Sequence, residues 1–254
     1  MKFPIFQLIN FGVILILLIF LIRYAWDLFF GSGYCPAEWA QAKKTGRIDK
    51  RLLHLQRYYP DRIRFFNWWL QVERLRREGI PGDFAELGVY KGESACVLHQ
   101  MDPGRKFHLF DTFSGMPPRD LALETGEAAT YTPDRFADTD VEGVLRKISG
   151  NENICIYPGY FPETADNVRD NIFALVNLDA DLYQPTRAAL EFFYPRLSPG
   201  GVIFIHDHNY KWEGIKKAVE EFVRNIPENP VFVPDIDNTC MIIRDKKCQF
   251  SADA

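Results

Sequence analysis

The clearest indication of the fold is Phe84-Ala-Glu-Leu-Gly-Val-Tyr-Lys-Gly-Glu-Ser94, which reads as a short strand followed by a glycine-rich turn and a helix. Gly88 and Gly92 allow the backbone to turn tightly and to approach a ligand closely. A helix that begins near Gly92 directs free N–H groups to the same place. The spacing is not the dinucleotide motif G-x-G-x-x-G, since Tyr90 stands where a central glycine could be. An ordinary tight turn is therefore the alternative interpretation.

Strands and helices alternate from this stretch to the C-terminus. The expected strands are Phe84–Gly88, Lys106–Phe110, Ile154–Tyr157, Phe173–Leu178, Val202–Ile205, Val231–Val233 and Thr239–Ile243, and the expected helices are Glu93–Met101, Val141–Ile148, Pro185–Arg196 and Lys211–Asn225. Strands as continuously apolar as Phe173–Leu178 are typical of a sheet covered on both faces. The pattern predicts one α/β domain with a doubly wound, mostly parallel seven-stranded sheet. The last two strands lack a long helix between them, so we expect an antiparallel pair at one edge.

Composition excludes several classes of protein. The 254 residues include 30 basic and 34 acidic side chains, for a net charge of −4, and 47% are hydrophobic. These values are ordinary for a globular protein and exclude a disordered, collagen-like or small disulfide-rich chain. A mildly acidic balance also argues against a nucleic-acid partner. The five cysteines have no metal-finger or C-x-x-C spacing, which favours a reducing compartment.

The first thirty residues differ from the rest. Phe3–Ile22 carries no charge, and ~20 helical residues span about 30 Å of hydrocarbon. A cleaved signal peptide or a buried core helix is the alternative, but the run lacks a small-residue cleavage site and any polar face. We therefore expect a transmembrane helix in residues 1–30 of a single-pass membrane protein. Basic residues after the span favour a catalytic domain that faces the cytoplasm.

Two further segments precede and interrupt the domain that we place at residues 82–254. Residues 31–81 read as a linker followed by a helix that Asp61 caps and that runs to about Glu78. Residues 112–139 are long for a connection and carry Gly115 and several prolines. Connections of this length are usually functional, so we expect a lid over a binding site.

Acidic residues follow several of the expected strands. Asp111 ends the second strand, where a carboxylate can accept the hydroxyls of a ribose, although it could instead cap the next loop. Asp179 follows the fourth strand and Asp207 follows the fifth, so both should lie at the carboxyl edge of the sheet. Oxygen ligands suit Mg²⁺. The sequence therefore predicts a site for Mg²⁺ or another divalent cation that joins the two strand ends.

The third ligand of this site stays open. His208 and Asn209 both follow Asp207, and Asn209 offers the oxygen that Mg²⁺ prefers. His206 and His208 would instead suit a transition metal. A lone aspartate at the end of a strand is more often a cap or a turn residue, but two neighbouring strand ends favour a site.

These segments together resemble S-adenosylmethionine-dependent, metal-dependent O-methyltransferases, and the whole pattern is most similar to the macrocin O-methyltransferase family. The matching pieces are Phe84–Gly92, Phe110–Pro117, Tyr157–Thr164, Leu178–Tyr183, Tyr194–Gly201 and the segment at Asp207. They occur in order over about residues 82–224. The family commonly has Asp-Asp-Tyr after the fifth strand, whereas this chain has Asp207-His-Asn-Tyr210.

The resemblance implies a role for each motif. S-adenosylmethionine would be bound by residues of the glycine-rich turn and by Asp111 at its ribose; the turn residues are Glu86, Gly88, Tyr90, Gly92 and Ser94. Asp179 would be a metal ligand and a catalytic base, with Asp207 as a second ligand. His206 is a further candidate base, and Asp181 is an alternative.

The function expected is methyl transfer to a hydroxyl, of a sugar or glycosylated metabolite by resemblance. A divalent cation would lower the pKa of that hydroxyl. The expected membrane helix suggests a lipid-linked sugar as a second type of acceptor, and a homo-oligomer is possible. The alternatives are a nicotinamide-dependent oxidoreductase and a membrane-tethered module that binds a cofactor without catalysis.

Overall fold

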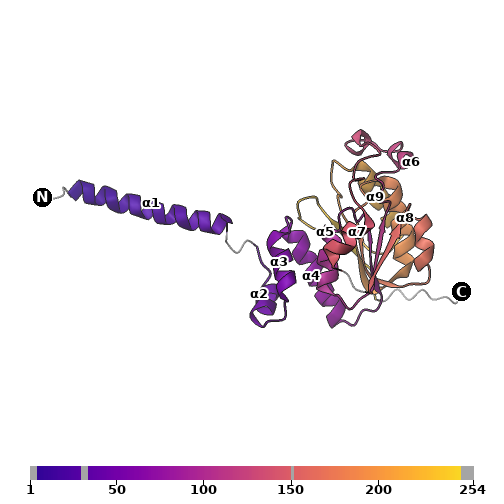
Figure 1. Ribbon diagram of the computed structural model, residues 1–254, viewed down its shortest axis with the longest axis horizontal. Coiled ribbons are helices and arrows are strands. Elements are labelled where there is room, and N and C mark those ends of the chain that lie inside the picture. The colour runs from indigo at the N-terminus through magenta and orange to yellow at the C-terminus, as the bar shows by residue number, and fades with distance from the viewer. Residues whose placement is uncertain (1–4, 30–33, 150–151, 247–254) are drawn as a thin grey trace. The chain divides into compact units, whose positions relative to one another are not determined.

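A seven-stranded sheet forms the centre of residues 48–254 in the computed structural model, which describes residues 5–29, 34–149 and 152–246 (Figure 1). The strand order is β3-β2-β1-β4-β5-β7-β6. The strands are β1 (Asp83–Leu87), β2 (Phe107–Asp111), β3 (Ile154–Pro158), β4 (Phe173–Leu178), β5 (Leu197–Ile205), β6 (Val231–Phe232) and β7 (Cys240–Ile243). The first five pair in parallel, whereas β7 pairs antiparallel with both β5 and β6. The predicted sheet and its antiparallel edge are confirmed.

Helices cover both faces of the sheet. One face carries α3 (Lys50–Tyr58), α4 (Arg62–Arg77), α5 (Glu93–Met101) and α7 (Val141–Ile148), and α5 contacts each of the other three (Figure 1). The other face carries α8 (Tyr183–Phe193) and α9 (Glu213–Val223), which also pack together. Asp61 caps α4, as predicted, because its Oδ1 accepts a hydrogen bond from the Arg64 amide at 2.9 Å. The doubly wound α/β class follows directly from this arrangement.

Aromatic packing anchors the ends of the central strands. Phe110 on β2 and Phe173 on β4 both contact Phe193 on α8, with ring centroids 6.0 Å and 5.0 Å apart. All three side chains are fully buried. Each contributes ~1.5–3 kcal/mol by leaving water. The end of β2 and the start of β4 are therefore both held against α8.

The N-terminal segment is a separate unit, residues 1–47, with helices α1 (Ile5–Phe29) and α2 (Ala37–Lys44). Residues 1–4 lie outside the described part of the chain. A membrane crossing needs ~20 apolar residues, and no helix among the described residues is both long and apolar enough for one. The predicted transmembrane helix, its membrane partner and the single-pass membrane localisation are therefore wrong.

The loops at the carboxyl edge of the sheet come together by strand register. Leu178 of β4 pairs with Ile205 of β5, so the next residues, Asp179 and His206, begin their loops side by side. Residues 112–139 also lie at this edge, with the short helices α6 (Pro118–Leu121) and η1 (Ala128–Thr130). The fold thus gathers the polar ends of four strands and one long connection at a single edge, the usual ligand site of open α/β sheets.

Candidate functional site

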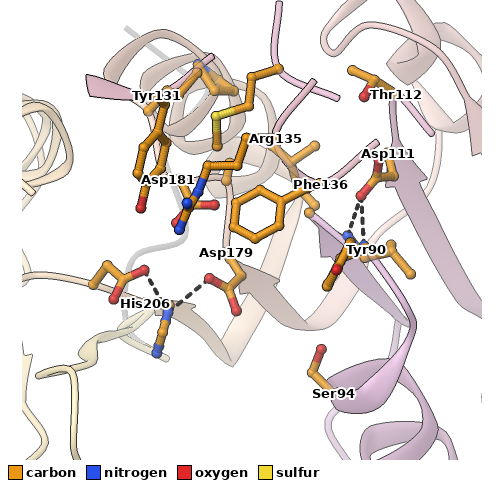
Figure 2. Close-up of a pocket in the computed structure, with 18 of the residues that line it drawn as sticks. Tyr90, Ser94, Asp111, Thr112, Tyr131, Arg135, Phe136, Asp179, Asp181 and His206 are labelled. Carbon is orange, nitrogen blue, oxygen red and sulfur yellow. Dashed lines mark hydrogen bonds and ion pairs between the residues drawn. The ribbon is translucent and has the colours of Figure 1, made fainter. Parts of the chain in front are cut away.

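A cavity of about 570 Å³ opens at the carboxyl edge of the sheet (Figure 2). Its walls come from the ends of the central strands, from residues 112–139 and from the start of α4. The lining includes Tyr59, Arg64, Gly88, Tyr90, Ser94, Asp111, Tyr131, Arg135, Phe136, Gly159, Phe161, Asp179, Asp181, His206, Asp207 and Asp237. Most of the residues that the sequence assigned to a cofactor or a cation therefore face one space.

The glycine-rich turn after β1 is shaped for close approach. Gly88 has a φ of +87°, Tyr90 of +46° and Gly92 of +75°, so three residues of the turn are left-handed. A Cβ on Gly88 would lie 1.9 Å from the carbonyl oxygen of Asp179. Only glycine fits there, because its missing side chain lets the turn touch the loop after β4. Gly92 begins α5 and presents the helix N-terminus to the cavity.

Asp111 fastens the same turn from β2. Its Oδ2 accepts hydrogen bonds from the amides of Val89 and Tyr90, both at 2.8 Å, and its Oδ1 accepts one from the amide of Phe113 at 2.8 Å (Figure 2). A carboxylate has about four acceptor positions. Three are taken, so one remains for a ribose hydroxyl, whereas the sequence suggested that Asp111 accepts both.

Glu86 lies beneath the turn rather than in the cavity. Its side chain is fully buried, and its Oε1 accepts hydrogen bonds from the Ser94 hydroxyl and, at 3.1 Å, from Asn177 Nδ2. Its Oε2 has no partner among the described residues. Burial raises the pKa of Glu86 to about 8. Ser94 reaches the cavity, and Glu86 fixes the orientation of its hydroxyl from behind.

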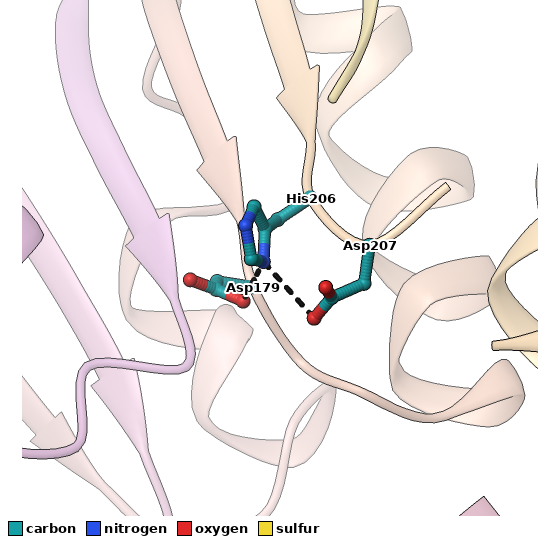
Figure 3. A group of neighbouring side chains, drawn as sticks. All are labelled: Asp179, His206 and Asp207. Atoms are coloured by element: carbon teal, nitrogen blue, oxygen red, sulfur yellow. Dashed lines mark hydrogen bonds and ion pairs between the residues drawn. The ribbon is translucent and has the colours of Figure 1, made fainter. Parts of the chain in front are cut away.

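Asp179, His206 and Asp207 form a compact cluster at the ends of β4 and β5 (Figure 3). His206 Nδ1 lies 2.8 Å from Asp179 Oδ1 and 3.0 Å from Asp207 Oδ2. One ligand atom from each residue lies within 4.8 Å of the others. Two carboxylate oxygens and one imidazole nitrogen at this spacing fit a divalent cation.

The charges of this cluster perturb one another. Burial alone would lower the pKa of His206, but the charge of Asp179 and the hydrogen bonds with Asp179 and Asp207 together outweigh it and raise that pKa to about 10. In turn the imidazolium holds the pKa of Asp179 below its usual range, against the effect of burial. Burial, together with the negative charges of Asp179 and Asp207, raises the pKa of Asp181 well above its usual range. Asp181 is thus the carboxyl group in the cavity that most readily holds a proton.

The other two predicted ligands lie elsewhere. The His208 ring packs against Phe232, with centroids 5.1 Å apart, and both His208 and Asn209 line a second cavity of about 370 Å³ beside α9. Asn209 Nδ2 donates a hydrogen bond to the carbonyl of Asp237 at 2.9 Å. The structure therefore brings His206, and neither His208 nor Asn209, to Asp179 and Asp207.

Residues 112–139 line the cavity, as expected of a lid. Tyr131, Arg135 and Phe136 project toward the strand ends, and the Arg135 guanidinium lies 3.8 Å from the centre of the Tyr131 ring (Figure 2). The end of the segment is tied to the glycine-rich turn, because Asp138 accepts a hydrogen bond from the Tyr90 hydroxyl at 2.8 Å and pairs with Lys91 at 2.5 Å. The sequence pointed to this segment by its length but named none of these side chains.

Three further residues line the cavity that no pattern in the sequence indicated: Tyr59, Arg64 and Asp237. Arg64 pairs with Asp235 and Asp237 at 3.4 Å each, which joins the start of α4 to the loop between β6 and β7. These partners are 171 and 173 residues apart along the chain. Contacts between residues so far apart in the sequence form only when the whole domain has folded, so no local pattern predicts them.

Comparisons with known proteins find a matching family model and several relatives of this chain. Residues 61–245 match the family model described as macrocin-O-methyltransferase (TylF). A 30% identical relative from Streptomyces olivaceus, an 8-demethyl-8-(2,3-dimethoxy-alpha-L-rhamnosyl)-tetracenomycin-C 4'-O-methyltransferase, aligns over 59% of this chain and 61% of its own length. Mycinamicin III 3''-O-methyltransferase from Micromonospora griseorubida is also 30% identical, over 59% of this chain and 64% of its own length.

The chain thus spans less than two thirds of the length of these relatives. Among solved structures, that of the O-methyltransferase NovP superposes with a TM-score of 0.63 at 24% identity and covers 72% of this chain and 80% of its own. A likeness at this identity bears on the fold, and it agrees with the doubly wound sheet.

Proposed function

Because the family model covers residues 61–245, the chain belongs to the macrocin O-methyltransferase family, and we propose that it transfers a methyl group from S-adenosylmethionine to a hydroxyl of a sugar or glycosylated metabolite. The two relatives described above are named as O-methyltransferases that act on a rhamnosyl tetracenomycin C and on mycinamicin III. The proposal rests mainly on one observation: the glycine-rich turn and Asp111 line the same cavity as the cluster of Asp179, His206 and Asp207. A methyl donor and an acceptor hydroxyl would meet between these two halves.

Residues 82–254 would supply most of the contacts with S-adenosylmethionine. The N-terminus of α5 and the Ser94 hydroxyl, oriented by Glu86, suit the polar methionine end. Asp111 has one acceptor position left for a ribose hydroxyl. Gly159 and Phe161, which follow β3, extend the cavity beyond Asp111 on the side away from β4, where the adenine would lie.

Asp179, His206 and Asp207 would hold a divalent cation. Such an ion supplies Lewis acidity, which lowers the pKa of a hydroxyl and lets a weak base suffice near neutral pH. Within the cluster His206 is paired with both carboxylates, so it is a poor proton acceptor. Asp181 faces the same cavity outside these pairs, and we assign it, in place of His206 or Asp179, to accept the proton of the hydroxyl.

The remaining side chains would exclude water and orient the acceptor. Tyr131 and Phe136 from the lid and Trp212 from the start of α9 offer apolar faces, and the Tyr131 and Trp212 rings lie 5.3 Å apart. Flat apolar faces suit the C–H surface of a sugar or an aglycone. Holding the acceptor oxygen in line with the methyl carbon and the sulfur removes much of the entropic barrier.

The test uses the purified full chain with methyl-labelled S-adenosylmethionine and a panel of glycosides. We expect label in the acceptor and one S-adenosylhomocysteine per methyl transferred. Asp181→Asn should lower kcat strongly while calorimetry still detects S-adenosylmethionine binding. Binding of NADH in place of S-adenosylmethionine would support the oxidoreductase alternative, and binding without transfer to any glycoside would support a non-catalytic module. The argument for a lipid-linked acceptor rested on the predicted membrane helix, and no helix among the described residues is long and apolar enough to be one.

A further inference from the structure

One nitrogen donor distinguishes the cation cluster. We propose that the site formed by Asp179, His206 and Asp207 selects a transition-metal ion over Mg²⁺, and that Asp237, held by Arg64 and Asn209, orients the His206 ring for this purpose. The inference rests on the proposed function in so far as that function places a divalent cation in the cluster. It adds the identity of the ion and names the residues that position its nitrogen ligand.

The donor set decides the preference. Mg²⁺ favours six oxygen ligands and keeps several waters, whereas imidazole nitrogen suits ions such as Co²⁺, Fe²⁺ and Zn²⁺. Asn209, which the sequence predicted as an oxygen ligand, does not join the cluster, and its Nδ2 donates a hydrogen bond to the Asp237 carbonyl. His206 occupies its place, with Nδ1 facing both Asp179 and Asp207. The described side chains therefore offer an ion one nitrogen and two carboxylates.

The second nitrogen of the ring has a matching acceptor. His206 Nε2 is buried and makes no hydrogen bond, and the atom facing it is Asp237 Oδ2 at 3.7 Å. A histidine that binds a metal through one nitrogen usually donates the N–H of the other to a carboxylate, which fixes the tautomer and raises the basicity of the ligand. A movement of under ~1 Å would close this pair to hydrogen-bond length.

Asp237 is itself held in place from two sides. Arg64 Nη2 lies 3.4 Å from Asp237 Oδ2, and Asn209 Nδ2 donates to the Asp237 carbonyl. Arg64 is in turn fixed by Asp235, whose Oδ1 accepts a hydrogen bond from the amide of Thr239 at 2.6 Å. These contacts explain why a buried arginine lies beside the cavity. Arg64 extends from α4 and holds Asp237, and Asp237 in turn faces the His206 ring.

The identity of the ion is tested by calorimetric titration of the full chain with Co²⁺ and with Mg²⁺, in the absence of S-adenosylmethionine and acceptor. We expect Co²⁺ to bind more tightly, and we expect His206→Asp, which makes the donor set all oxygen, to reduce the ratio of the two affinities at least ~10-fold. Co²⁺ bound through nitrogen also changes its visible absorption, and His206→Asp should remove that change. An equal affinity ratio in the two proteins would overturn the proposal.

The positioning role is tested with Asp237→Ala and Asp237→Asn. Loss of a carboxylate behind a metal-binding histidine typically weakens binding ~10–100-fold. Asp237→Ala should therefore weaken Co²⁺ binding by at least ~10-fold, whereas Asp237→Asn should recover part of it, because its amide oxygen can still accept from Nε2. Glu142→Gln is the charge-matched control, since its side chain on α7 is 86% exposed. Co²⁺ affinity in Asp237→Ala equal to that of the control would refute the role.

These measurements are independent of methyl transfer. Thermal unfolding of each variant, without metal, separates a lost ligand position from a lost fold. A chain that transfers methyl groups but binds Co²⁺ no better than Mg²⁺ would overturn this inference and leave the proposed function intact. A chain that binds Co²⁺ as described but transfers no methyl group would do the reverse.

Discussion

Glu86 should make the stability of the protein fall as the pH rises, and Glu86→Gln should remove that dependence. In the folded protein burial raises the pKa of this carboxyl to about 8, from a value near ~4.3 in an unfolded chain. Between these two values the folded state holds a proton that the unfolded state has released. The stabilising contribution is therefore complete below the unfolded pKa and is lost as the pH rises through about 8.

The size of the effect follows from the same numbers. Within that range each pH unit changes the free energy of unfolding by ~1.4 kcal/mol. From pH 5.5 to pH 7.5 the wild type should thus lose ~3 kcal/mol relative to Glu86→Gln. Gln mimics the protonated acid, since its oxygen can accept from Ser94 and Asn177 as Oε1 does. Its amide takes the place of Oε2, which has no hydrogen-bond partner among the described residues.

Urea unfolding of both proteins at the two pH values, with chelator present, measures the difference. Titrations common to both chains, including those of the His206 cluster, cancel in the comparison. Glu142→Gln, which removes an exposed carboxylate, should follow the wild type. If the unfolding free energies of wild type and Glu86→Gln keep a constant difference from pH 5.5 to pH 7.5, Glu86 is not a buried proton carrier and the reasoning fails.

Three further predictions concern the cavity at the carboxyl edge of the sheet. Gly88→Ala should destabilise the fold by ~3 kcal/mol or more in urea unfolding, because a Cβ there would lie 1.9 Å from the Asp179 carbonyl oxygen. The control is Gly104→Ala, which should be tolerated because a Cβ on Gly104 would have nothing within 4 Å. Equal effects of the two substitutions would contradict the steric argument. Excess chelator should stop methyl transfer while calorimetry still detects S-adenosylmethionine binding, and full turnover in chelator would exclude a role for the cation. Lys91→Met should barely change the unfolding free energy, since the ion pair with Asp138 is exposed. It should raise the KM for S-adenosylmethionine, because it removes the ion pair between residues 112–139 and the glycine-rich turn. An unchanged KM would show that this ion pair does not contribute to binding.

The sequence predicted the elements where one kind of pattern dominates. Phe173–Leu178 is apolar except for Asn177, and Glu93–Met101 follows a glycine. Both elements have the predicted bounds in the structure. Asp179 and Asp207 were placed together by the rule that parallel strands end at one edge. These predictions need only local pattern and a topological rule.

The third member of the cluster needed strand register instead. Leu178 pairs with Ile205, which places His206 level with Asp179, whereas His208 and Asn209 continue past the sheet. A register argument applied to the two strands would have favoured His206. The link from Arg64 to Asp237 has no comparable signal, because the positions of α4 and of the loop before β7 relative to each other depend on the packing of the whole domain. The N-terminal prediction also failed, because no helix among the described residues is both long and apolar enough to cross a membrane.

The contact between Gly88 and Asp179 has a consequence for equilibrium. The turn that would receive S-adenosylmethionine touches the backbone of a residue in the cation cluster, and the Asp179 amide donates a hydrogen bond to the Leu87 carbonyl at 2.9 Å. A displacement of the turn must therefore move Asp179 as well. A methyl donor in the turn and an ion in the cluster would therefore be thermodynamically linked. Linkage is reciprocal, so the methyl donor would change the affinity for the ion by the same factor as the ion changes the affinity for the methyl donor.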